Sequence, residues 1–131
     1  MEIIEEVLDE IESALKSPKG IISHQRRLAF CLSLGIVYLL EYYLKKLNVF
    51  KPGAKINHLW LKKKKENVKK FISNQITCPV ENIKSLNRIL DVAYILESER
   101  NELAYGKTSS EENLKEKISL FLDLKKEIEN A

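Results

Sequence analysis

The segment from residue 21 to residue 48 constrains the fold more than any other part of the chain. Apolar side chains recur along it at helical spacing, in a first row made of Ile22, Ala29, Leu32, Ile36, Leu39, Tyr43 and Leu47. A second row widens this surface beyond one stripe, with Phe30, Val37, Leu40 and Leu44. A helix that is apolar on several sides needs cover from several neighbours. We therefore expect a long central helix, covered by its own bundle or by another subunit.

Three other segments show the same helical periodicity. Residues 2–16 predict one helix, residues 77–105 predict a second that stops at Gly106, and a capping box of Ser109 and Glu112 opens a third. The buried face expected for the second consists of Ile83, Leu86, Leu90, Ala93, Tyr94 and Leu96. We expect these helices to pack against the central one.

The turns between these helices are short, and the 131 residues include only 4 Gly and 3 Pro. A turn at residues 49–53 leads into residues 57–72, which predict one or two short helices. No segment alternates apolar and polar residues as a strand does. The sequence thus predicts an all-α fold in one domain, residues 1–131: an antiparallel up-and-down bundle of four long helices plus a short helical insert.

The formal net charge is only +3, but the charges are unevenly distributed. From residue 2 to residue 12 there are six acidic residues and no basic one, whereas residues 45–70 contain ten lysines and one acid, Glu66. Such a basic block favours a polyanionic partner, although a solvated helix face has the same composition. The run Lys62, Lys63, Lys64 and Lys65, near Trp60 and Phe71, could contact a nucleic-acid backbone.

The cysteines and the N-terminus bear on the compartment. Cys31 and Cys78 form neither a zinc motif nor a disulfide framework, so a reducing cytoplasm is expected, with no metal or cofactor. The N-terminus is acidic rather than basic-then-apolar, so no secretory signal is expected. The nearly apolar run at residues 28–40 is shorter than the roughly 20 residues that cross a bilayer. We therefore expect no membrane association.

The segment from Glu99 to Gly106, with the sequence ERNELAYG, carries the clearest chemical signal. Arg100 and Asn101 stand near the end of a predicted amphipathic helix, and Tyr105 follows five residues after Arg100. An arginine held there offers a fork of donors that suits a phosphate. A structural interpretation is also open, because Glu97 lies three residues before Arg100 and could pair with it on the helix surface.

This segment resembles the motif of the HEPN family of small helical bundles, in which an Arg, often followed by Asn, precedes a His near the end of the penultimate long helix. Arg100 and Asn101 match that frame, as do Leu103, Ala104 and Gly106. The helix order matches as well, so the likeness covers most of the chain. The position of the family histidine is occupied by Tyr105.

The resemblance implies a homodimer that brings two such motifs into one cleft. In active members this cleft cuts RNA without a metal, and many members are toxins neutralised by a small nucleotidyltransferase. Other members lack the catalytic pair and bind nucleotides or protein partners.

The substitution of Tyr for His weighs against catalysis more than against binding. Metal-free RNA cleavage needs a proton acceptor, and a phenol is almost wholly protonated at neutral pH, whereas an imidazole titrates near it. Lys107 is the only nearby cation that could assist Tyr105. His58, just before the lysine run, could line the cleft from another helix and supply the missing imidazole.

Three hypotheses follow from these features. The first is an HEPN-like module of toxin–antitoxin lineage that binds RNA, a nucleotide or a nucleotidyltransferase and has weakened or lost catalysis. The second is a metal-independent endoribonuclease toxin that uses Arg100, Asn101 and Tyr105. The third is a structural or adaptor bundle without a ligand. The residues expected to contact phosphate or nucleic acid are Arg100, Lys107, His58, Lys62, Lys63, Lys64 and Lys65.

Overall fold

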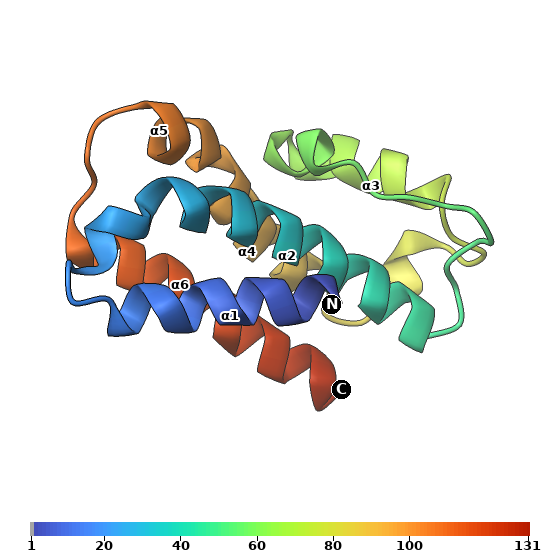
Figure 1. Ribbon diagram of the computed structural model, residues 1–131. Helices are drawn as coiled ribbons and strands as arrows, with labels where there is room; N and C mark the ends of the chain where they lie inside the picture. The colour runs from blue at the N-terminus through green and yellow to red at the C-terminus, as the bar shows by residue number, and fades with distance from the viewer. Residues whose placement is uncertain (1) are drawn as a thin grey trace.

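The computed structural model describes residues 2–131, and its regular elements are helices (Figure 1). In chain order they are α1 (Ile3–Lys16), the 3₁₀ helix η1 (Ile21–His24), α2 (Gln25–Lys46), the 3₁₀ helix η2 (His58–Lys62), α3 (Lys65–Ser73), the 3₁₀ helix η3 (Val80–Asn82), α4 (Leu86–Ser98), α5 (Arg100–Tyr105) and α6 (Glu111–Glu129). Within residues 2–131, strand-like pairing is limited to one isolated bridge between Phe50 and Ile76. The predicted all-α class is therefore confirmed.

Helix α2 lies at the centre of the molecule, and α1, α4, α5 and α6 all pack against it (Figure 1). Its buried positions include most of the first predicted row, although Ile22 and Leu47 at the two ends are exposed. Gly35 sits at the closest approach of three helices. A Cβ at this position would lie 2.6 Å from the ring of Phe121 on α6 and 3.2 Å from Val7 on α1. The glycine lowers helix propensity but lets the helices come together.

The predicted continuous helix from residue 77 to residue 105 is wrong, because this stretch is divided twice. After η3 the chain passes through Ser85, which has a left-handed backbone with φ of 66°, before α4 begins. A second break at Glu99 separates α4 from α5. Tyr94, expected in the buried face, is exposed.

The break at Glu99 arises because α5 is attached to the beginning of α2. Gln25 donates hydrogen bonds to the carbonyl oxygens of Leu103 and Lys107, each at 3.0 Å. Arg26 donates to the carbonyl of Ala104, also at 3.0 Å. These side chains satisfy backbone acceptors at the end of α5 that would otherwise lack partners. They hold α5 against α2.

The last helix begins one residue later than the predicted capping box implies. The hydroxyl of Ser110, rather than that of Ser109, accepts the backbone N–H of Asn113 at 3.1 Å. Ser109 instead accepts the side-chain amide of Asn113 at 2.8 Å. The cap is therefore present, displaced by one position.

The predicted short helices are confirmed as η2 and α3, which together form an insert at residues 58–73. The ring of Trp60 stacks on Phe71 with centroids 5.1 Å apart, and Leu61, Val68 and Ile72 are buried. Element η2 packs against both α4 and α2. The insert therefore forms a wall beside α2.

The segment Ile21–Lys46 is long and apolar enough to cross a bilayer, with a mean hydropathy of 1.4 over its best window. The apolar run at residues 28–40 is thus only the middle part of this segment. More than half of that window is buried within the protein, as expected also of a core helix in a soluble bundle. Length and composition are weak evidence for a membrane span.

Candidate functional site

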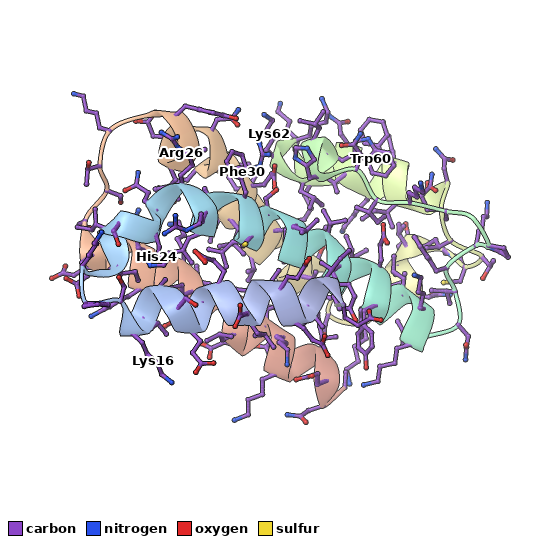
Figure 2. All side chains as sticks on the ribbon, viewed as in Figure 1. Lys16, His24, Arg26, Phe30, Trp60 and Lys62 are labelled. Atoms are coloured by element: carbon purple, nitrogen blue, oxygen red, sulfur yellow. The ribbon has the colours of Figure 1, made fainter. Side chains whose placement is uncertain are left out.

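A groove of about 570 Å³ lies between α2, the start of the insert and the first residue of α5. It is lined by Phe30, Ser33, Leu34, Val37, Lys55, Ile56, Asn57, His58 and Arg100, and is called the Arg100 groove below. In Figure 2, Phe30 lies on α2 between α5 and the insert that carries Trp60 and Lys62. Its size and its mixture of an apolar wall with a few polar groups are typical of a small-molecule site.

Arg100 lines this groove together with a second cation, Lys55, and pairs with no carboxylate within residues 2–131. Its guanidinium lies over the ring of Phe30, 4.8 Å from the centroid, and its Nη1 donates to the side chain of Asn101 at 3.1 Å. Its Nε–H is buried and has no hydrogen-bond partner in the described chain. A buried donor without an acceptor lowers the stability of the fold.

Glu97 does not pair with Arg100 on the helix surface, which corrects the structural interpretation. Its side chain is only 2% exposed. One carboxylate oxygen accepts the hydroxyl of Ser33 at 2.7 Å, and the other lies 2.6 Å from Nδ1 of His58. A buried carboxylate is tolerated when donors satisfy it, and here two donors come from α2 and η2.

The contact with Glu97 determines which nitrogen of His58 faces a ligand. An ionised carboxylate can only accept, so Nδ1 carries the proton and Nε2 keeps its lone pair. Within residues 2–131, Nε2 has no hydrogen-bond partner. It is therefore the ring nitrogen available to a ligand in the Arg100 groove.

Local structure holds His58 in place. The side chain of Asn57 caps η2 by accepting the backbone N–H of Leu59 at 2.9 Å. The backbone N–H of Ile56 donates to Glu41 on α2 at 2.8 Å, and the Ile56 side chain is buried. Because these bonds anchor the chain directly before His58, the imidazole is positioned before any ligand arrives.

The other predicted motif residues lie outside this groove. Asn101 is exposed and accepts from Arg100. Tyr105 is 73% exposed and packs edge-on against Phe30, with centroids 6.0 Å apart. Lys107 is exposed, and its backbone carbonyl accepts from Gln25. Tyr105 therefore supports the wall of the groove from outside and does not line it.

The lysine run borders a different surface. Lys62, Lys63, Lys64 and Lys65 line a second groove of about 470 Å³ together with residues of α4, and it shares no lining residue with the Arg100 groove. Lys65 pairs with Asp91 at 2.7 Å. The residues expected to contact nucleic acid are thus divided: Arg100 and His58 share one groove, the four lysines share the other, and Lys107 lines neither.

Glu97 and Ser33 were missed as site residues, although the sequence contains a signal for both. Glu97 follows Ala93 by four positions and therefore continues the predicted buried face of that helix. Ser33 follows Ala29 by four positions on the buried row of α2. A polar residue at such a position needs a buried partner, and these two residues are partners of each other.

Neither a metal-binding cluster nor a reactive thiol accompanies this groove among the described residues. In the part of the chain that the structure describes, no group of three or more His, Cys, Asp or Glu residues could hold a metal ion. Burial raises the pKa of the Cys31 thiol, and the nearby charges of Glu10 and Glu6 add to this effect. Cys31 is therefore a poor nucleophile at neutral pH.

No protein-family model, curated protein or solved structure matches this chain.

Proposed function

We propose that this protein is an HEPN-like module that binds the phosphate of RNA or of a nucleotide in the Arg100 groove. The observation that carries this proposal is the guanidinium of Arg100, which lines the groove and pairs with no carboxylate within residues 2–131. Two of the guanidinium's neighbours, Phe30 and Asn101, orient it without neutralising its charge. A phosphate bound by the guanidinium would balance this charge.

The remaining walls of the groove suit the other parts of a nucleotide. Leu34, Val37 and Ile56 provide an apolar side against which a base can lie. Lys55, which is exposed and forms no ion pair among the described residues, adds a second positive charge at the rim. Binding should be weakly selective for sequence, because the groove offers few groups that could read base edges.

The finer architecture and the assembly are part of the same proposal. We propose an antiparallel arrangement of α1, α2, α4 with α5, and α6, joined into a homodimer through the outer side of α2. That side carries Leu34 and Tyr42, which are exposed, and Tyr38, which stacks on Tyr42 with centroids 6.1 Å apart. A dimer formed here would place two Arg100 grooves near each other and cover this apolar surface. Sedimentation as a monomer would contradict it.

A metal-independent endoribonuclease is the second candidate function. One observation favours it: an imidazole, His58, lies in the same groove as Arg100 even though Tyr105 stands at the family's histidine position. In either case a small nucleotidyltransferase is the partner that the resemblance implies, and co-purification of the two would support the toxin–antitoxin lineage.

Binding can be tested by fluorescence anisotropy with a labelled single-stranded RNA in EDTA. Arg100→Gln should lower the affinity about tenfold, a loss of about 1.4 kcal/mol, and should reduce the salt slope by about one counterion. The control is Arg88→Gln, because Arg88 is exposed and pairs with Glu127 outside the Arg100 groove.

Equal affinity of wild type and Arg100→Gln would remove the basis of the proposal. If neither binds RNA, the ligand-free adaptor bundle becomes the better interpretation.

A further inference from the structure

We infer that His58, oriented by Glu97, is the proton acceptor of a ribonuclease centre in the Arg100 groove, in place of a histidine at position 105. This inference rests on the proposed binding of RNA phosphate by Arg100. It assigns the catalytic base to η2 and its positioning residue to α4, two elements outside the Arg100–Tyr105 motif. The structure thereby offers a route to catalysis that the motif alone lacks.

The imidazole of His58 is held in one orientation by its neighbours. Nδ1 of His58 is held 2.6 Å from the carboxylate of Glu97, and the hydroxyl of Ser33 holds the other carboxylate oxygen at 2.7 Å. A base whose far nitrogen is bound by a carboxylate is fixed in one tautomer and one orientation. Nε2 is then ready to accept a proton without prior rearrangement.

The imidazole and Tyr105 differ in their position. His58 and Arg100 both line the Arg100 groove, whereas Tyr105 packs edge-on against Phe30, is largely exposed and does not line the groove. A base must reach the proton that it removes, and a cation must reach the phosphate next to it. Among the described residues, His58 is the imidazole that meets this condition, because His24 lies toward α1 (Figure 2).

The reaction is an internal transesterification of RNA. Nε2 of His58 takes the proton of a ribose 2′-hydroxyl while that oxygen forms a bond to the adjacent phosphorus. The bond between phosphorus and the 5′ oxygen breaks, and this oxygen takes a proton from water. The resulting hydroxide neutralises the imidazolium, so the base is regenerated and a 2′,3′-cyclic phosphate remains.

Arg100 has a separate part in this step. Negative charge accumulates on the phosphate oxygens as the 2′ oxygen attacks, and a fixed guanidinium stabilises this charge. Arg100 pairs with no carboxylate of the described chain, so its charge is free for this part. Because the step needs a 2′-hydroxyl, the substrate class is RNA, and DNA would be bound but not cut.

The test uses a short fluorescein-labelled single-stranded RNA and its fully 2′-O-methylated counterpart, both in EDTA. Wild type should bind both but cleave only the first, with products that mass spectrometry shows to end in a 2′,3′-cyclic phosphate. His58→Gln should lower the cleavage rate by about 10²- to 10⁴-fold and retain RNA binding. His24→Gln is the matched control and should cleave like wild type.

Two further variants separate catalysis from folding. His58→Ala should recover activity on addition of free imidazole, which a merely structural role of His58 would not permit. Glu97→Gln should lower kcat by about 10- to 100-fold with little change in KM, since it loosens the base without altering the phosphate contact.

Measuring RNA binding and RNA cleavage separately distinguishes the catalytic role of His58 from the binding of RNA phosphate by Arg100. RNA bound by wild type but not cleaved, or cleaved equally by His58→Gln, would overturn the catalytic inference and leave phosphate binding intact. Cleavage of the 2′-O-methylated RNA would exclude the transesterification. Absence of RNA binding by wild type would overturn both.

Discussion

The protein contains two contacts between a histidine and a carboxylate that are chemically alike and differ in their surroundings. Nδ1 of His24 lies 2.8 Å from Glu10, and Nδ1 of His58 lies 2.6 Å from Glu97. In the first pair, Arg27 also donates to the same carboxylate oxygen at 2.9 Å. In the second pair, the additional donor is a neutral hydroxyl, that of Ser33.

The arginine near each pair makes the contrast sharper. Arg27 pairs with Glu10, so the two charges beside His24 neutralise each other and join α1 to α2. Arg100, in contrast, pairs with no carboxylate in the described chain, and its Nε–H is buried without a partner. A histidine–carboxylate contact is therefore insufficient evidence for a site. An uncommitted cation beside a groove is the feature that separates the two pairs.

The largest difference should appear when each carboxylate is removed. Glu97→Ala leaves a buried hydroxyl and a cavity, so the free energy of unfolding should fall by about 3 kcal/mol. Glu10→Ala should lower the free energy of unfolding by only about 1 kcal/mol, because water can solvate its partner Arg27. Urea unfolding followed by circular dichroism measures both. Equal losses would mean that the two pairs differ only in position.

Replacing each arginine should change stability in opposite directions. Arg100→Leu removes a buried donor that has no partner, so the free energy of unfolding should rise by about 1 kcal/mol while RNA binding is lost. Arg27→Leu breaks the ion pair between the exposed Arg27 and Glu10. It should lower the free energy of unfolding by roughly a few tenths of a kcal/mol. Thermal melts of both variants measure the sign. A loss of stability in Arg100→Leu would argue that Arg100 is a structural residue.

The smallest effect concerns the thiol near the first pair. Burial, followed by the charges of Glu10 and Glu6, raises the pKa of Cys31, so less of it is thiolate at neutral pH. Glu10→Gln removes one of these charges and should lower that pKa, which speeds alkylation of Cys31 by a factor of about two or three. Iodoacetamide labelling at neutral pH, in a Cys78→Ser background, measures this rate. A rate independent of Glu10 would leave burial as the sole cause.

The sequence was sufficient for the class and position of most helices, because their periodicity is governed by burial along one element. It failed at Glu99, where hydrogen bonds from Gln25 and Arg26 hold α5 against α2. Those bonds join residues about eighty positions apart, and no local pattern reports them. Helical periodicity therefore predicted one helix where tertiary contacts produce two.

The candidate site was predicted less completely than the helices, because it too depends on contacts between residues that lie far apart in the sequence. The motif segment pointed to Arg100, and its sequence position next to Tyr105 suggested a shared role. The structure instead brings Arg100 together with His58, a residue about forty positions earlier, and leaves Tyr105 outside the groove. Glu97 and Ser33 could have been suspected as polar residues in buried rows, but only the packing of α4 on α2 shows that they meet.

The break at Glu99 places two neighbours in sequence on separate helices. Glu97 moves with α4, while Arg100 belongs to the short helix that is fastened to the beginning of α2. Substitutions that shift α4 would therefore move the Glu97 carboxylate relative to the Arg100 guanidinium. The separation of these two groups can change through the packing of one helix, with neither side chain replaced.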